Sequence, residues 1–213
     1  VSGGMDSATA VYEAIEQDYD PLFLHTSYGQ RTEDKEFSCA KKLAEEVDAE
    51  FFHIKTDHLS RIGGSSLTDD EIDVGDSDEG SGEIPNTYVP FRNANLLSMA
   101  VSFAEAQSAG AVFVGAHSED FAGYPDCRPE FFEAFQQVVD RGTKPEMKID
   151  IKTPFVEWSK TDIVERGLKL GVPYEYSWSC YRAEEPACGT CDSCKYRLQA
   201  FQRAGARDPI PYA

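Results

Sequence analysis

Four cysteines lie close together near the C-terminal end of this 213-residue sequence. Cys180 is followed by Cys188, Cys191 and Cys194, which gives the spacing C-x7-C-x2-C-x2-C. Two-residue gaps let successive thiolates turn onto one ion, and a tetrahedral site of four thiolates is closed to substrate. The spacing therefore predicts a structural Zn²⁺ site. A disulfide framework, which a reducing cytoplasm disfavours, and an iron–sulfur cluster are the alternatives.

The chain opens with a glycine-rich loop that reads Ser2-Gly3-Gly4-Met5-Asp6-Ser7 and directly precedes a predicted helix. Two adjacent glycines let backbone N–H groups approach an anion, and the helix N-terminus adds about half a positive charge. The hydroxyl groups of Ser2 and Ser7 can donate to phosphate oxygens, and Asp6 can hold Mg²⁺ through water. The alternative is a plain strand-to-helix turn with Ser7 as its N-cap. The loop matches neither GxxxxGK[ST] nor GxGxxG.

Helices and strands alternate along the chain. Helices are predicted at residues 7–17, 32–47, 93–107, 129–139 and 160–170, and strands at residues 21–25, 50–55, 111–116 and 148–152. Gly171 is expected to close the helix over 160–170. This order predicts a Rossmann-like α/β fold, an open parallel sheet with helices on both faces, whose ligands bind beyond the carboxyl ends of the strands.

The domain organisation follows from length and motif position. We expect an α/β domain over residues 1–175 and a four-cysteine zinc module with a C-terminal helix over residues 176–213, packed as part of the same unit. Because the chain begins within the glycine-rich loop, we expect the strand that leads into it to be missing from the sequence. Residues 56–86 form a long polar segment with an acidic cluster between residues 69 and 83. The cluster lacks the spacing of a calcium loop, so a solvated insertion is predicted.

The charge balance is strongly acidic, with 20 Lys and Arg against 38 Asp and Glu and a formal net charge of −18. This balance disfavours a nucleic-acid partner, whose phosphates need a basic surface. It suits a high-salt cytoplasm, because at ~1 M salt the screening length falls to ~3 Å and self-repulsion becomes tolerable. An acidic protein from a low-salt source is the alternative. No run approaches the ~20 apolar residues of a membrane span, so the cytoplasm is the expected location.

The SGGxDS pattern of the loop resembles the signature of PP-loop ATPases, and that resemblance implies cleavage of ATP between its α and β phosphates. Over essentially the whole chain, the sequence resembles the 7-cyano-7-deazaguanine synthase family. The matching segments are 2–7, 28–31, 88–90 with Arg92 and Asn93, 123–128, 153–154 with Lys160, 171–175, 178–181, the three remaining cysteines, 204–205, 208–209 and Tyr212. Phe91 departs from the family pattern, which has glycine there.

The resemblance implies that ATP activates 7-carboxy-7-deazaguanine for attack by ammonia, through an amide, to give 7-cyano-7-deazaguanine. It implies that the loop binds ATP with Mg²⁺, and that Gln30 and Arg31 contact the nucleotide or order a lid. Arg92 and Lys160 are the candidate catalytic residues, which would neutralise phosphate or carboxylate charge. A surface ion pair is the alternative for both.

Four residues are candidates for contact with the deazapurine. Asp126 would accept hydrogen bonds from the guanine-like edge of the base, and Tyr124 or Phe91 would stack on its face. Arg128 lies in the same matching segment. A tRNA-modifying PP-loop enzyme and a non-catalytic nucleotide sensor are the rival functions, and a homodimer is the expected assembly.

Overall fold

The computed structural model describes residues 1–75, 84–118 and 123–213. Its elements in chain order are α1 (Met5–Glu16), β1 (Phe23–Ser27), α2 (Glu33–Glu46), β2 (Phe51–Lys55), α3 (His58–Ile62), α4 (Arg92–Gln107), β3 (Ala111–Phe113), η2 (Pro125–Cys127), α5 (Pro129–Gly142), β4 (Asp150–Lys152), α6 (Lys160–Leu170), η3 (Tyr174–Tyr176) and α7 (Asp192–Arg203). The predicted alternation of helix and strand is confirmed. Within the described residues, no helix is long and apolar enough to cross a membrane.

The strands pair in parallel, as the sequence predicts. β1 pairs with β2, with Phe23 opposite Phe51, and β3 pairs with β4, with Ala111 opposite Asp150. Within the described residues the two pairs form separate sheets, and residues of both β1 and β3 line one cavity. The predicted open sheet is thus divided into two parallel pairs with this cavity between them.

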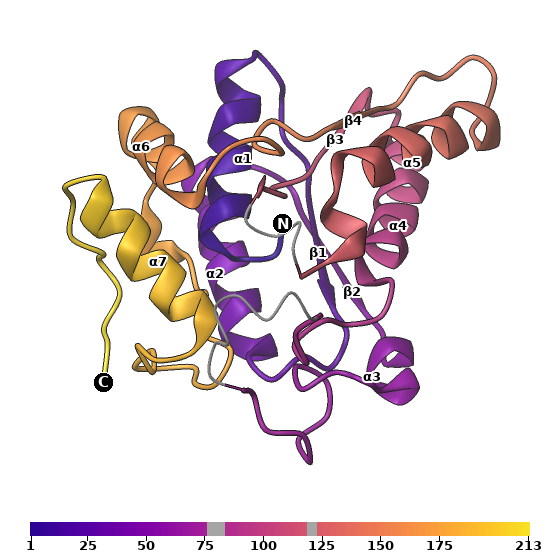
Figure 1. Ribbon diagram of the computed structural model, residues 1–213. Helices are drawn as coiled ribbons and strands as arrows, with labels where there is room; N and C mark the ends of the chain where they lie inside the picture. The colour runs from indigo at the N-terminus through magenta and orange to yellow at the C-terminus, as the bar shows by residue number, and fades with distance from the viewer. Residues whose placement is uncertain (76–83, 119–122) are drawn as a thin grey trace.

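Helices cover both faces of the strands (Figure 1). On one side, α4 contacts β1 and β3, and α5 contacts β4. On the other side, α1 packs against α6, and α6 packs against α7. The prediction of helices on both faces is confirmed.

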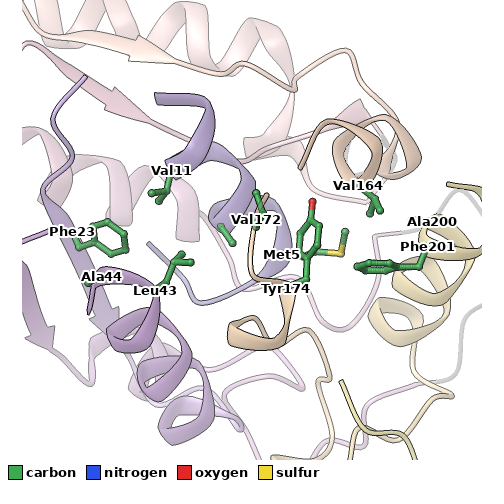
Figure 2. Close-up of a cluster of buried hydrophobic side chains, with 11 residues drawn as sticks. Met5, Val11, Phe23, Leu43, Ala44, Val164, Val172, Tyr174, Ala200 and Phe201 are labelled. Atoms are coloured by element: carbon green, nitrogen blue, oxygen red, sulfur yellow. The ribbon is translucent and has the colours of Figure 1, made fainter. Parts of the chain in front are cut away.

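One core cluster joins the first helix of the chain to the last (Figure 2). It contains Met5 of α1, Phe23 of β1, Leu43 of α2, Val164 of α6 and Phe201 of α7, and each of these side chains is at least 98% buried. Burying such a side chain contributes roughly 1.5–3 kcal/mol. The helix that follows the glycine-rich loop and the helix that follows the cysteines therefore share one apolar core.

Helix α6 begins and ends where the sequence predicts. Ser159 and Asp162 form a capping box at its start, and Gly171 adopts the left-handed conformation at its end. Helix α3 lies inside the segment predicted to be a loop. Its five residues are too few to show apolar periodicity, so the sequence pattern could not reveal it.

Strand β3 ends three residues earlier than predicted. A Cβ atom on Gly115 would lie 2.9 Å from the backbone of Asp6, so the chain beyond Phe113 passes directly against the glycine-rich loop. This approach leaves no room for a side chain at position 115, and the Val114 N–H still donates to the Lys152 carbonyl over 2.8 Å. Of the acidic cluster at 69–83, residues 76–83 lie outside the described residues.

Candidate functional site

The glycine-rich loop is a tight turn at the start of α1. Gly3 has φ +84°, and a Cβ atom there would overlap the backbone carbonyl of Glu36. The Ser2 N–H donates to Ser7 Oγ over 3.1 Å, and the Gly4 N–H donates to Ser2 Oγ over 3.2 Å. Gly4, rather than Ser7, is the N-cap of α1, so the alternative of a turn capped by Ser7 is wrong. The loop presents a helix N-terminus to an anion.

A cavity of about 540 Å³ opens beside this loop. Eight of the residues predicted to bind ATP or to act in catalysis line it: Ser2, Gly4, Asp6, Ser7, Gln30, Arg31, Arg92 and Lys160. Gly3 shapes the turn, and Met5 is 99% buried in the core beneath the loop, so neither lines the cavity. The sequence therefore identified residues that the fold brings together.

Asp6 lies between two basic side chains. Its Oδ2 atom is 3.5 Å from Lys160 Nζ and 3.7 Å from His117 Nε2. The Lys160 side chain is 11% exposed, so this pair is buried rather than on the surface. Asp6 Oδ1 is buried without a hydrogen-bond partner among the described residues. A hard cation prefers such a carboxylate oxygen, so Asp6 fits a role in Mg²⁺ binding.

His117 also lines the cavity, and the sequence reasoning missed it. The residue lies just past a core strand, where ligands of parallel sheets bind, and this position was the available signal. Glu36 of α2 was missed as well. It accepts hydrogen bonds from Thr32 Oγ1 at 2.7 Å and from Gln30 Nε2 at 3.1 Å, and burial raises its pKa.

Gln30 and Arg31 contact the protein itself. Gln30 Oε1 accepts from the Tyr28 N–H over 2.9 Å. The Arg31 guanidinium donates to the carbonyl groups of Ser66, Asp69 and Ile72 over 2.6–2.9 Å. Of the two roles predicted for this pair, the contacts of Arg31 fit the ordering of a lid.

Arg92 is a partly buried cation on the cavity wall. Burial alone would lower its pKa, but neighbouring Tyr28 and Cys127 raise it well above the ordinary value. Within the described residues, no carboxylate lies within salt-bridge distance of Arg92, so the predicted alternative of a surface ion pair does not apply. A partly buried guanidinium on a cavity wall suits a phosphate or carboxylate group of a ligand.

The residues predicted to contact the deazapurine occupy different environments. Tyr124 lines the cavity, and its hydroxyl lies 2.8 Å from Thr87 Oγ1. Asp126 is 4% exposed and does not line the cavity, because its Oδ2 accepts the Asn93 N–H at the start of α4 over 2.8 Å. Arg128 is exposed and forms the N-cap of α5, so it too lies off the cavity wall.

The four predicted cysteine ligands converge at the far end of the chain. One ligand atom from each of Cys180, Cys188, Cys191 and Cys194 lies within 4.8 Å of the others. Backbone N–H groups of Arg182, Ala183 and Cys188 donate to Cys180 Sγ over 3.3–3.4 Å.

The four sulfurs are close enough to interact with one another. Side-chain hydrogen bonds among them lower the pKa of Cys180 and raise the pKa of Cys191 and Cys194. All six cysteines are free, so the alternative of a disulfide framework is wrong. Four converging sulfurs with amide donors fit a structural Zn²⁺ ion.

Comparison with known proteins decides the family. The family model described as "Queuosine biosynthesis protein QueC" matches residues 1–205. The chain belongs to this family. Curated relatives named 7-cyano-7-deazaguanine synthase include that of Haloarcula marismortui, 68% identical over 100% of this chain and 92% of the relative. Another, from Halobacterium salinarum, is 67% identical over 100% of this chain and 93% of the relative.

Membership of the QueC family confirms the resemblance found in the sequence. Relatives from halophilic archaea agree with the high-salt interpretation of the charge. A solved structure of NMN synthetase from Francisella tularensis matches 97% of this chain and 75% of its own, with a TM-score of 0.50 and 17% identity. At that identity the likeness shows the fold alone.

Phe91 precedes α4 in an unusual backbone conformation. Its φ of 55° lies in the left-handed region, where glycine carries no steric penalty and a bulky residue is strained. The side chain is 60% exposed and its ring lies edge-on to Phe131 with 6.3 Å between centroids. Phe91 does not line the cavity, so Tyr124 is the better placed of the two candidates for stacking.

Proposed function

We propose that this chain is an ATP-dependent ligase that converts 7-carboxy-7-deazaguanine and ammonia to 7-cyano-7-deazaguanine, the precursor of queuosine or archaeosine. Membership of the QueC family supports the proposal. The single structural observation that carries it is the cavity wall that combines the glycine-rich loop with the buried cation Lys160 and the partly buried cation Arg92. This combination suits a nucleoside triphosphate beside an anionic substrate.

The proposed reaction activates the same carbon twice. A carboxylate oxygen attacks the α-phosphorus of ATP and pyrophosphate leaves. Ammonia then attacks the acyl carbon, AMP leaves, and the amide forms with loss of a proton. The amide oxygen attacks a second ATP, which releases pyrophosphate and one N–H proton. Loss of AMP and the last N–H proton gives the nitrile. Each step needs a positioned electrophile and neutralised phosphate charge.

The roles proposed for the residues follow from their positions. The Ser2 and Ser7 hydroxyl groups and the amides at the start of α1 bind the pyrophosphate end of ATP. Asp6 would hold Mg²⁺, which neutralises phosphate charge when bound. Lys160 and Arg92 counter the charge of phosphate or carboxylate oxygens.

The four cysteines would hold Zn²⁺ in a closed site, where it stabilises the fold. We further propose that the protein acts in the cytoplasm on small molecules, as a homodimer and without a nucleic-acid or membrane partner. Its strongly acidic charge would repel nucleic acid and an anionic membrane surface.

Product analysis tests the proposal. Purified protein is incubated with ATP, Mg²⁺, ammonium and 7-carboxy-7-deazaguanine, and the products are identified by mass spectrometry. We expect the nitrile together with AMP and pyrophosphate. Release of ADP instead would contradict adenylation, and ATP binding without pyrophosphate release would indicate a nucleotide sensor.

A further inference from the structure

Leu67 forms part of the cavity wall and belongs to a segment, residues 65–75, that we call the cover segment. Leu67 is 7% exposed. It packs in a cluster with Tyr28, Leu59 and Val89. The cover segment lies in the long connection between β2 and α4, within which α3 is the one helix among the described residues. Its position therefore depends on contacts with other parts of the fold.

The first set of such contacts comes from Arg31, between β1 and α2. Its side chain donates to the carbonyl groups of Ser66, Asp69 and Ile72, and its backbone N–H donates to the Leu67 carbonyl over 3.0 Å. These contacts fix the middle of the cover segment.

The second contact comes from the cysteine cluster. Arg182 Nη2 donates to the Val74 carbonyl over 2.6 Å, near the other end of the cover segment. The same guanidinium donates from Nη1 to Thr190 Oγ1 over 3.2 Å, and the Arg182 N–H donates to Cys180 Sγ over 3.4 Å. Thr190 lies between the ligand candidates Cys188 and Cys191, and its own N–H donates to Cys188 Sγ over 3.5 Å. Arg182 thus joins the loops that carry the cysteines to the cover segment.

We propose that Arg182 is a positioning residue. By connecting the four-cysteine module to the cover segment, it holds that segment, and with it Leu67, in place at the wall of the proposed ATP cavity. The proposal rests on the proposed function for the identity of the cavity's ligand, but the link between module and wall stands independently of it. A guanidinium suits this link because its planar fork donates in two fixed directions, whereas a lysine ammonium on a flexible stem is a single point donor. The neighbouring Tyr181 lines the same cavity and packs against the Leu67 cluster, so the module also touches the wall directly.

Hydrogen–deuterium exchange of the ligand-free, zinc-loaded protein tests the link. Among the described contacts, the amides of Ser66, Thr68 and Ile72 are hydrogen-bonded in the cover segment and report its order. We expect Arg182→Gln to raise exchange in peptides covering 65–75 about tenfold, as loss of one charge-assisted hydrogen bond predicts. Thr190→Val, which removes the anchor of the guanidinium, should give a smaller increase. Arg182→Lys should recover part of the protection.

Arg61→Gln is the matched control. Arg61 lies in α3 with a 78% exposed side chain and pairs with Asp57 at 3.6 Å, so it makes the same change of charge near the cover segment without touching it. Exchange in 65–75 should stay at the wild-type level in this variant. Unchanged exchange in Arg182→Gln would overturn the proposal. Loss of zinc from that variant would also overturn it, because Arg182 would then belong to the metal site rather than link it to the wall.

Kinetics provide the second readout. A displaced wall weakens nucleotide binding more than it alters the chemical step, so the KM for ATP should rise about tenfold in Arg182→Gln with kcat little changed. A fall in kcat at unchanged KM would contradict positioning of the wall. If the wild-type protein forms no nitrile, the proposed function fails, while the exchange measurement still decides the link.

Discussion

The cysteine module and the cavity beside the glycine-rich loop are built in opposite ways. All four candidate metal ligands lie between Cys180 and Cys194, and the turns between them bring the sulfurs together. The cavity wall instead collects residues from distant segments, such as Asp6, Arg92 and Lys160. A site built from one short segment depends on local turns and its ion, whereas a site built from many segments depends on the packing of the whole fold.

The largest expected effect is the loss of one cysteine ligand. In Cys194→Ser the remaining three thiolates no longer close a tetrahedral site, and metal binding in such modules supplies much of the folding free energy. We expect loss of bound zinc and destabilisation of several kcal/mol, measured by metal analysis and thermal unfolding. Cys39→Ala is the control, since Cys39 is buried against the same cluster but is outside the ligand set. It should keep its zinc, and loss of zinc there would refute the four-ligand assignment.

The difference between the two regions also explains what the sequence could predict. The cysteine spacing and the SGGxDS loop are local patterns, so their residues were identified without knowledge of the fold. The contact of Lys160 with Asp6 joins positions far apart in the chain, and only its family resemblance pointed to a role. His117 and Glu36 belong to no short pattern, because each becomes part of the site only through the folding of separate elements.

The residues predicted to contact the substrate also show what sequence position alone does not reveal. Asp126 and Arg128 belong to the same matching segment as Tyr124, yet the turn η2 directs Asp126 to α4 and leaves Arg128 at the surface. Adjacent residues in a turn point in different directions, and sequence position alone does not give that direction. The left-handed backbone of Phe91 is a conformation that glycine, which the family resemblance leads us to expect there, would adopt without strain.

A second large effect concerns the ion pair that fastens the C-terminal tail to α7. Arg197 is 0% exposed and donates to both carboxylate oxygens of Asp208 over 2.8 and 3.0 Å. Asp208→Asn leaves a buried cation without its counter-charge, which costs about 3–5 kcal/mol. Denaturant unfolding measures the loss. Asp57→Asn, which breaks only the exposed pair with Arg61, should cost less than about 1 kcal/mol. Equal losses would show that burial of the first pair is unimportant.

An intermediate effect is expected at the turn of the glycine-rich loop. Gly3→Ala places a Cβ atom against the Glu36 carbonyl at a φ that favours glycine, so we expect destabilisation of about 2 kcal/mol together with a large loss of ATP affinity. Thermal unfolding and calorimetric titration with ATP measure the two effects. Gly110→Ala is the control, because a Cβ atom at Gly110 would meet no other atom within 4 Å. Normal ATP affinity in Gly3→Ala would rule out the loop as the phosphate site.

The smallest effect is expected from substitution of Asp126, and it distinguishes substrate binding from helix capping as the role of this residue. The structure uses its carboxylate to accept the Asn93 N–H at the start of α4, next to Arg92. Asparagine can accept the same hydrogen bond and is as good a helix cap as aspartate, so Asp126→Asn should keep stability within about 0.5 kcal/mol and retain most activity. Asp126→Ala should lose about 1 kcal/mol, since no acceptor remains.

Denaturant unfolding and the rate of nitrile formation, measured on both variants, separate the two roles. A carboxylate that bound the base edge of the substrate directly would be needed for its charge, and Asp126→Asn would then lose activity while keeping its stability. If the carboxylate only caps α4, Asp126→Asn should keep both stability and activity. Asp126→Ala should lose both. In that case Asp126 acts on the site indirectly. It stabilises the start of α4, and the first turn of α4 carries Arg92, which lines the cavity.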